Sequence, residues 1–269
     1  MTILCPLLNQ YGDCLWALPT IRALAASGAL IDVLVREQCQ GLVPLLTLQP
    51  YIATCLIGEE VSAHSNYDQV ISLAYRPMDG TALPQHIYQT AARAWRGDRA
   101  LQPLDLHRPW ITLGEGPSAR TGTVIGFNDE LWELKRTLAQ QVEEALNGSE
   151  LRVMRHLTGP KARWTTQLPC DWVAAAHHIQ NAYMFLGGCG GLHVLAVALG
   201  TPAVIAEPDA RRWDLIFWPL GMDGPQVTCV RRDEQPVWEA ELVVQTLRAV
   251  FARTWIRMQG PRRFWIRKV

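Results

Sequence analysis

The chain has 269 residues, 49% of them hydrophobic and 19% charged, with 25 acidic and 25 Lys or Arg side chains. This composition excludes a disordered chain, and the length suits one large domain or two modest ones. The zero net charge argues against a protein that grips nucleic acid along a broad surface, and no apolar run approaches the ~20 residues of a membrane span.

The cysteine pattern predicts reduced thiols. None of the seven cysteines forms a Cys-x-x-Cys pair, and most lie in apolar stretches. We therefore expect buried thiols and no zinc site, as is typical of a cytoplasmic protein. The first residues also lack the charged leader and the cleavage site of a signal peptide.

The first half of the chain alternates short apolar runs with helical patterns. We predict strands at residues 2–8, 31–35, 55–57 and 69–73, and helices at residues 15–26, 37–46 and 83–95. This alternation predicts a parallel sheet wrapped by helices. Proline and glycine become frequent over residues 102–122, which indicates a linker.

The pattern then restarts. We predict strands at residues 123–127, 150–156, 182–186 and 203–206, and helices at residues 130–146, 171–181 and 238–255. The predicted fold class is α/β, with two Rossmann-like parallel-sheet domains that face a cleft. The predicted domains are residues 1–115 and 116–240, followed by a C-terminal helix and tail at residues 241–269.

A glycine-rich turn separates the predicted strand at 182–186 from an apolar helix. The turn and the helix start read Gly187-Gly188-Cys189-Gly190-Gly191-Leu192-His193. Glycines allow a ligand to approach the backbone, and the first amides of a helix attract anions. A tight turn without any ligand explains the same pattern, so both interpretations stay open here.

A second candidate site follows the first strand. The residues there are Asn9-Gln10-Tyr11-Gly12-Asp13, and an apolar helix comes next. Asp13 either caps that helix or serves as a general base at the carboxyl edge of a parallel sheet, where open α/β folds place their ligands.

Three segments together resemble the ADP-heptose:lipopolysaccharide heptosyltransferases, a family with the GT-B fold. The opening reads Gly12-Asp13-Cys14-Leu15-Trp16-Ala17-Leu18-Pro19-Thr20-Ile21-Arg22-Ala23-Leu24, and a later strand reads Tyr67-Asp68-Gln69-Val70-Ile71-Ser72-Leu73. Residues 189–202 align without gaps to the family signature Asp-Ser-Gly-x-x-His-x-Ala-x-Ala-Leu-Gly-Thr-Pro. The resemblance covers most of the chain in the right order.

The signature also departs from the family. Cys189 occupies the place of its Asp, Gly190 that of its Ser, and Val194 that of its His, while His193 lies one residue early. Backbone contacts to a diphosphate survive such changes, whereas side-chain contacts do not. The second half is also shorter than is usual for the family, chiefly between residues 146 and 169.

The resemblance implies an inverting, metal-independent glycosyltransferase without a cofactor. Asp13 would be its general base, and residues 9–12 would form the acceptor-side loop. Residues 187–193 would bind a nucleotide-diphosphate sugar, with Glu207 on its ribose and Arg211 near the leaving phosphates. The implied acceptor is a glycan or a lipid-linked molecule. Glu207 and Arg211 are equally consistent with solvated surface residues.

Two alternatives remain. Cys189 and Val194 favour a GT-B-shaped binding or scaffolding protein that has lost catalysis. The C-terminal tail carries seven basic residues after Glu241 and no acid, interleaved with aromatic residues. Such a tail suits a nucleic-acid or membrane surface, which allows an enzyme that glycosylates hydroxylated bases in DNA. A solvated tail is the simpler explanation.

Overall fold

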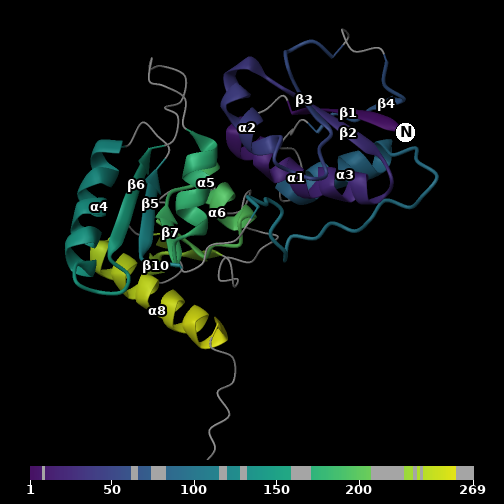
Figure 1. Ribbon diagram of the computed structural model, residues 1–269. Helices are drawn as coiled ribbons and strands as arrows, with labels where there is room; N and C mark the ends of the chain where they lie inside the picture. The colour runs from purple at the N-terminus through teal and green to yellow at the C-terminus, as the bar shows by residue number, and fades with distance from the viewer. Residues whose placement is uncertain are drawn as a thin grey trace, which may run out of the picture.

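Figure 1 shows the computed structural model of the chain. The structure describes residues 1–7, 10–61, 66–73, 83–114, 120–127, 132–158, 171–206, 227–232, 235–236 and 239–258. Within them, two separate parallel sheets are present, and residues 95–114 connect the two regions without a helix or strand. The prediction of two Rossmann-like parallel-sheet regions is therefore confirmed.

The N-terminal region is built on a four-stranded sheet in the order β3-β2-β1-β4. All of its described pairings are parallel. Its strands are β1 (Thr2–Leu7), β2 (Leu30–Val35), β3 (Thr54–Ile57) and β4 (Gln69–Val70). Its helices are α1 (Tyr11–Ala26), the 3₁₀ helix η1 (Glu37–Leu42), α2 (Val43–Leu46) and α3 (Leu83–Ala94).

One predicted helix is interrupted. Residues 37–46 form η1 and then the single turn of α2 rather than one continuous α-helix. Pro44 lies in the first turn of α2 and has no amide to donate to the preceding turn. A proline is tolerated at that position because the first amides of a helix are unpaired in any case.

The C-terminal region is built on a five-stranded parallel sheet in the order β6-β5-β7-β8-β9. Its strands are β5 (Thr123–Phe127), β6 (Val153–Thr158), β7 (Met184–Gly187), β8 (Ala203–Ile205) and β9 (Val227–Cys229). Its helices are α4 (Trp132–Leu146), α5 (Trp172–Gln180), α6 (Gly191–Ala198) and α8 (Ala240–Met258). Strand β9 and the antiparallel pair β10 (Arg231–Arg232) and β11 (Gln235–Pro236) were not predicted from the sequence.

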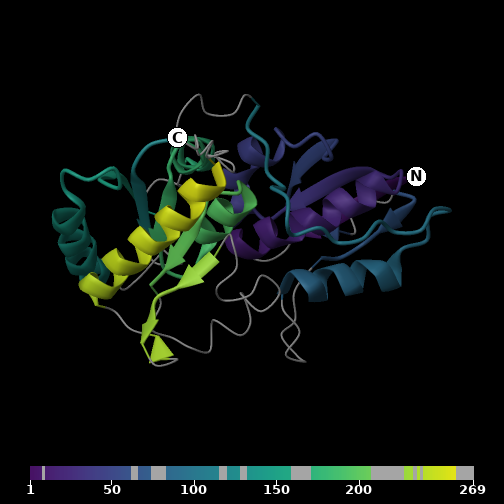
Figure 2. The ribbon, with the colours of Figure 1, turned by 90° about the horizontal axis from the view of Figure 1, so that it is seen from below.

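Alternate residues along the second sheet pack into two different hydrophobic cores. On β7, Phe185 packs into a core shared with α1, α5 and α6, whereas Met184 and Leu186 pack into a core with α4 and α8. The first core also contains the helix-facing residues of β1 and β2, so it runs without a break from one sheet region to the other. Both views show α5 and α6 between the second sheet and the N-terminal region (Figures 1 and 2).

Helix α1 is the centre of this shared core. It contacts β1 and β2 on one side and packs against α3 and α6. Residues 14–21 are all buried. A helix that is apolar all round needs such burial on every side. The continuous apolar run that follows Asp13 in the sequence is thereby explained.

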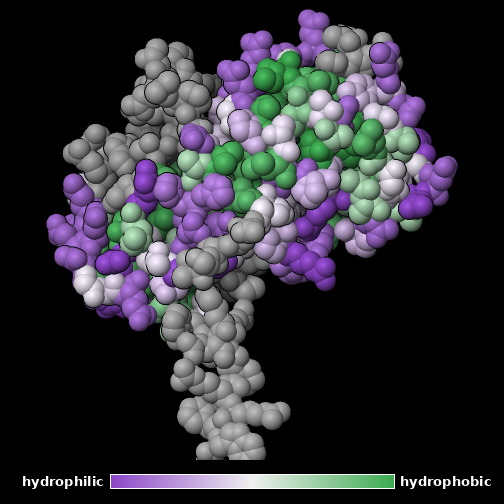
Figure 3. All heavy atoms as spheres, in the orientation of Figure 1, coloured by the Kyte–Doolittle hydropathy of each residue, from purple (hydrophilic) through white to green (hydrophobic). Residues whose placement is uncertain are grey.

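The surface differs between the two regions. Figure 3 shows apolar side chains spread over the N-terminal region, whereas the outer side of α4 is mostly hydrophilic. Five of the six exposed large hydrophobic residues of the described chain lie in the N-terminal region: Met1, Leu30, Leu48, Ile57 and Val70. No helix among the described residues is long and apolar enough to cross a membrane.

Candidate functional site

Asp13 lies in the first turn of α1. The helix begins at Tyr11, four residues earlier than predicted, and Gln10 is its N-cap residue. The Asp13 carboxylate forms a hydrogen bond with the backbone of Gln10, which lowers its pKa, but burial outweighs this effect and raises the pKa above the usual value. Asp13 is therefore bonded to the start of its own helix, and its raised pKa gives it the stronger basicity that proton abstraction requires.

The glycine turn occupies the corresponding position in the second region. Strand β7 ends at Gly187, and α6 begins at Gly191 with Gly190 as its N-cap residue. Gly187 has a packing role of its own, because a Cβ atom there would lie 2.2 Å from the carbonyl oxygen of Gly126 on β5. Gly187 is thus required for the approach of β5 to β7, whether or not a ligand binds.

His193 closes the turn from within. Its Nδ1 accepts a hydrogen bond of 2.7 Å from the backbone N–H of Gly190. The ring is buried, and this burial lowers its pKa to about 3. His193 is therefore neutral near pH 7, and it engages one of the amides that the glycine pattern offered to an anion.

The starts of the two helices meet. A Cβ atom added to Gly12 would lie 3.6 Å from both the backbone nitrogen and the Cα of Gly191, and 3.8 Å from a methyl group of Val194. Two motifs almost 180 residues apart in the chain are thus neighbours in the fold, with room for a methyl group between them. The structure thus brings Gly12, which precedes Asp13, close to Gly191, which is the first residue of α6.

An aromatic stack flanks this junction. Tyr11, the first residue of α1, stacks on Trp172, the first residue of α5, with ring centroids 5.2 Å apart. The Tyr11 hydroxyl donates a hydrogen bond of 2.5 Å to the carbonyl oxygen of Gln38 in η1. Tyr11 was predicted as part of an acceptor-side loop, but it belongs to the helix. Trp172 was not among the predicted residues, because nothing in the sequence near it indicates its distant partner.

Two buried cysteines, Cys14 and Cys39, lie close to Asp13. Cys14 donates to the carbonyl oxygen of Leu7 over 3.6 Å. A hydrogen bond with Cys14 lowers the pKa of the Cys39 thiol; burial and the nearby Asp13 charge act in the opposite direction, and Arg36 acts in the same one. Cys14, Cys39 and Cys189 are all buried, as predicted for cysteines in apolar stretches.

Several predicted site residues cannot be placed. Asn9, Glu207 and Arg211 lie outside the described residues, as do Cys170 and the basic tail beyond Met258. Gly188 and Cys189 lie in the turn between β7 and α6, and Leu192 is buried in the first turn of α6. The described part of the chain contains no group of three or more His, Cys, Asp or Glu side chains arranged to hold a metal ion.

No protein-family model matches this chain, and no curated protein does either.

Comparison of structures gives a different result. E. coli ADP-heptose lipopolysaccharide heptosyltransferase II matches with a TM-score of 0.66 and 16% identity, over 95% of this chain and 100% of that one. E. coli heptosyltransferase WaaC with ADP matches with a TM-score of 0.64 and 14% identity, over 93% and 100%. A family 9 glycosyltransferase from Veillonella parvula matches with a TM-score of 0.59 and 11% identity, over 94% and 97%. The chain has the GT-B fold of these heptosyltransferases, in a divergent form.

Proposed function

We propose that this protein is a glycosyltransferase that moves a sugar from a nucleotide-diphosphate sugar to an acceptor hydroxyl. The observation that supports this most directly is the close approach of Gly12, which precedes Asp13, to Gly191 of the glycine turn. It brings the residue that precedes Asp13, a carboxyl of raised pKa, close to the start of a second helix, within a fold shared with heptosyltransferases.

In the proposed reaction, the start of α6 binds the donor diphosphate. Gly190 has no side chain to cap the helix, so backbone amides of the first turn remain for an anion. The Gly190 amide is not among them, because it donates to His193. The positive end of the helix would also stabilise charge on the departing diphosphate, as an oxyanion site does. This chemistry requires no bound metal and no cofactor.

Asp13 would act as the general base. Its ionised carboxylate accepts the proton of the acceptor hydroxyl while the hydroxyl oxygen bonds to the anomeric carbon. The bond from that carbon to the diphosphate oxygen breaks, and the nucleoside diphosphate leaves. A single displacement of this kind inverts the anomeric configuration. A pKa raised by burial makes the carboxylate a stronger base than an exposed aspartate.

The remaining roles follow the family resemblance. Glu207 would bind the donor ribose, and Arg211 would neutralise the leaving phosphates. We propose a glycan or lipid-linked acceptor on the N-terminal side, near residues 9–12.

One observation favours a second candidate function. Cys189 and Val194 replace the acid and the histidine of the family signature, and both are buried apolar-type side chains here. A protein that binds the nucleotide sugar without transferring it would fit these replacements. The two candidates differ in turnover and not in donor binding.

A thermal-shift screen against ADP-, UDP-, GDP- and CMP-linked sugars, with the free nucleotides alongside, tests the proposal first. A ligand that binds only the folded protein raises its unfolding temperature with occupancy. Stabilisation by one nucleotide class, followed by sugar transfer to an acceptor mixture, would support the enzyme. Stabilisation without transfer would support the binding protein, and no stabilisation at millimolar ligand would contradict both.

A further inference from the structure

The segment at residues 105–112, here called the strap, lies between the two sheet regions and buries the side chains of Leu106, Trp110 and Ile111. It contains no helix or strand, yet Trp110 is 1% exposed and Ile111 is 3% exposed. Loops of this kind normally run over the surface, since their backbone groups need partners. The hydrogen-bond partners of the strap therefore show what holds Trp110 and Ile111 in the core.

The side chain of Trp110 supplies a hydrogen bond that Pro19 removes from α1. Pro19 lies inside the helix and has no amide to donate to the carbonyl of Leu15, four residues earlier. The indole Nε1 of Trp110 donates to that carbonyl at 3.2 Å. The indole ring also packs on Trp16, with centroids 5.5 Å apart. Trp110 thus supplies the hydrogen bond that the helix cannot make for itself.

The backbone of the same residue is fixed to α6. The N–H groups of Trp110 and Ile111 donate to the carbonyl oxygen of Ala198, the last residue of α6, at 2.9 and 3.1 Å. Pro109 lies against Gly200, where a Cβ atom would be only 2.7 Å from its ring. Trp110 is therefore bonded to α1 through its side chain and to α6 through its main chain.

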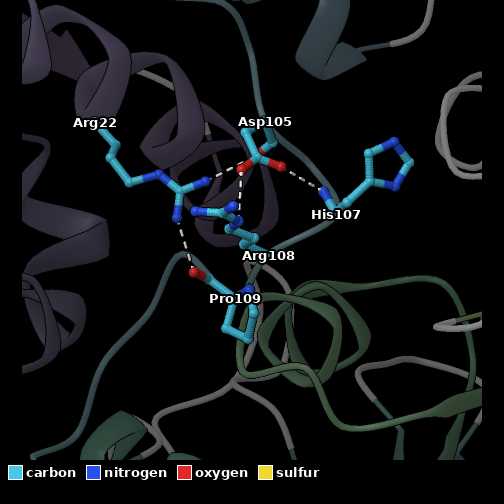
Figure 4. A network of polar contacts seen from close by, with 5 residues as sticks. All are labelled: Arg22, Asp105, His107, Arg108 and Pro109. Carbon is cyan, nitrogen blue, oxygen red and sulfur yellow. Dashed lines mark hydrogen bonds and ion pairs between the residues drawn. The ribbon is translucent and has the colours of Figure 1, made fainter.

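A charged side chain secures the strap further along α1. Arg22 donates two hydrogen bonds to the strap, one of 2.8 Å to the carbonyl of Pro109 and one of 2.7 Å to that of Asp105 (Figure 4). The Asp105 carboxylate accepts the backbone N–H of His107 at 3.0 Å and lies 3.6 Å from the guanidinium of Arg108. These contacts hold the strap in one conformation.

We propose that Trp110 is a positioning residue that sets the spacing between α1 and α6, and hence between Asp13 and the glycine turn. It acts through the backbone of Leu15 and Ala198, not through contact with substrate. The catalytic part of this inference rests on the proposed sugar transfer, whereas the structural part does not.

A double-mutant cycle between residues 110 and 19 tests the bond. Trp110→Phe keeps an aromatic ring but removes the N–H, and should lower the unfolding midpoint by about 5 °C because the buried Leu15 carbonyl loses its donor. Pro19→Ala restores an amide that can bond to this carbonyl. In the Pro19→Ala background the same Trp110→Phe change should therefore lower the midpoint much less.

Trp172→Phe is the matched control for ring size. Trp172 is also 1% exposed, but its Nε1 has no hydrogen-bond partner among the described residues. Its replacement measures the packing cost of a smaller ring, and Pro19→Ala should leave that cost unchanged. If Pro19→Ala failed to reduce the cost of Trp110→Phe, Trp110 would only fill space and the proposal would be wrong.

The effect of the spacing on the pKa of Asp13 is measured by NMR without any activity assay. The carboxyl carbon of Asp13 is identified by its absence in Asp13→Asn and titrated with pH. Trp110→Phe should expose this carboxyl and lower its pKa towards the ordinary value, and Pro19→Ala should reverse the shift. An unchanged titration in Trp110→Phe would overturn the positioning role.

Kinetics then test the catalytic consequence. Trp110→Phe should reduce kcat about tenfold or more with little change in donor KM, and the double variant should recover. A wild-type protein without transfer activity would contradict the proposed function alone, because the unfolding cycle and the Asp13 titration would still decide the role of Trp110.

Discussion

Gly12 and Gly191 lie next to each other across the junction of the two sheet regions. A Cβ atom on Gly12 would lie 3.6 Å from the backbone nitrogen of Gly191. The first turns of α1 and α6 therefore lie close together, with room for a methyl group between them. The residue that precedes Asp13 is thus a neighbour of the glycine turn, although the two motifs belong to different sheet regions.

Substitutions at Gly12 should separate packing from function. Gly12→Ala places its Cβ at an ordinary contact distance, so we expect stability to be unchanged or raised by up to about 1 kcal/mol through helix propensity. Gly12→Val adds methyl groups against Gly191 and Val194, and should force α1 and α6 apart. We expect Gly12→Val to remain folded and to lose donor binding, as measured by thermal shift. Equal donor binding by the two variants would show that the contact does not shape the site.

Asp13→Asn tests the proposed base directly. Asparagine keeps the size of the side chain and can still accept a hydrogen bond from the backbone of Gln10, but it cannot take a proton from an acceptor hydroxyl. General-base catalysis contributes on the order of 100-fold to 10,000-fold, so kcat should fall by at least about 100-fold while donor binding persists. Undiminished turnover in steady-state assays would remove Asp13 from the mechanism.

The same variant should change how stability depends on pH. Burial raises the folded-state pKa of Asp13, so the folded protein holds this proton more tightly than the unfolded chain does. The stability that the group contributes is complete below the unfolded pKa, and is lost as pH rises through the folded pKa. Asp13→Asn should therefore unfold at a higher temperature than the wild type at pH 7, and this advantage should vanish at acidic pH. Parallel unfolding curves at all pH values would contradict the raised pKa.

The sequence predicted most elements because their apolar runs are local signals. Strands β1, β2 and β5 and the strand–turn–helix around Gly190 lie within a few residues of their predicted positions. The start of α1 was missed because Tyr-Gly-Asp is a poor helix-forming sequence on its own. Its first turn is held instead by the stacking of Tyr11 on Trp172, a residue remote in sequence.

The partners across the junction could not be predicted. Pro19 indicates a helix with one unpaired carbonyl, but nothing local identifies Trp110 as its donor, since Trp110 lies in a proline-rich segment typical of an exposed linker. His193 was assigned to donor binding because it follows a glycine turn. Its bond to Gly190 and its burial give it a structural role that only the folded chain reveals.

Two glycines allow a matched test of packing. Gly187→Ala would place its Cβ 2.2 Å from the carbonyl of Gly126, so β5 and β7 must separate; we expect a loss of about 3 kcal/mol or more. Gly148 has φ +77° and no neighbour within 4 Å, so Gly148→Ala should cost only the backbone strain of about 1–2 kcal/mol. Chemical denaturation measures both. A smaller loss at Gly187 than at Gly148 would contradict the close approach of the two strands.

His193 should make the protein sensitive to acid. Burial lowers its folded-state pKa from 6.5 to about 3, so the unfolded chain binds the proton first as pH falls. The stability contribution of neutral His193 is complete above pH 6.5 and should be lost progressively as pH falls towards 3. His193→Gln removes the titration, while its side-chain oxygen can still accept the N–H of Gly190, as glutamine does at this position of a capping box.

Unfolding midpoints between pH 7 and pH 4 check this prediction. The wild type should lose stability more steeply than His193→Gln over this range, and the two should be comparable at pH 7. His193→Leu is the matched control, because it removes both the titration and the acceptor: it should be destabilised at pH 7 but show the same shallow pH dependence as His193→Gln. A wild-type curve as shallow as that of both variants would mean that the pKa of His193 in the folded protein is not lowered, and that its ring is open to solvent.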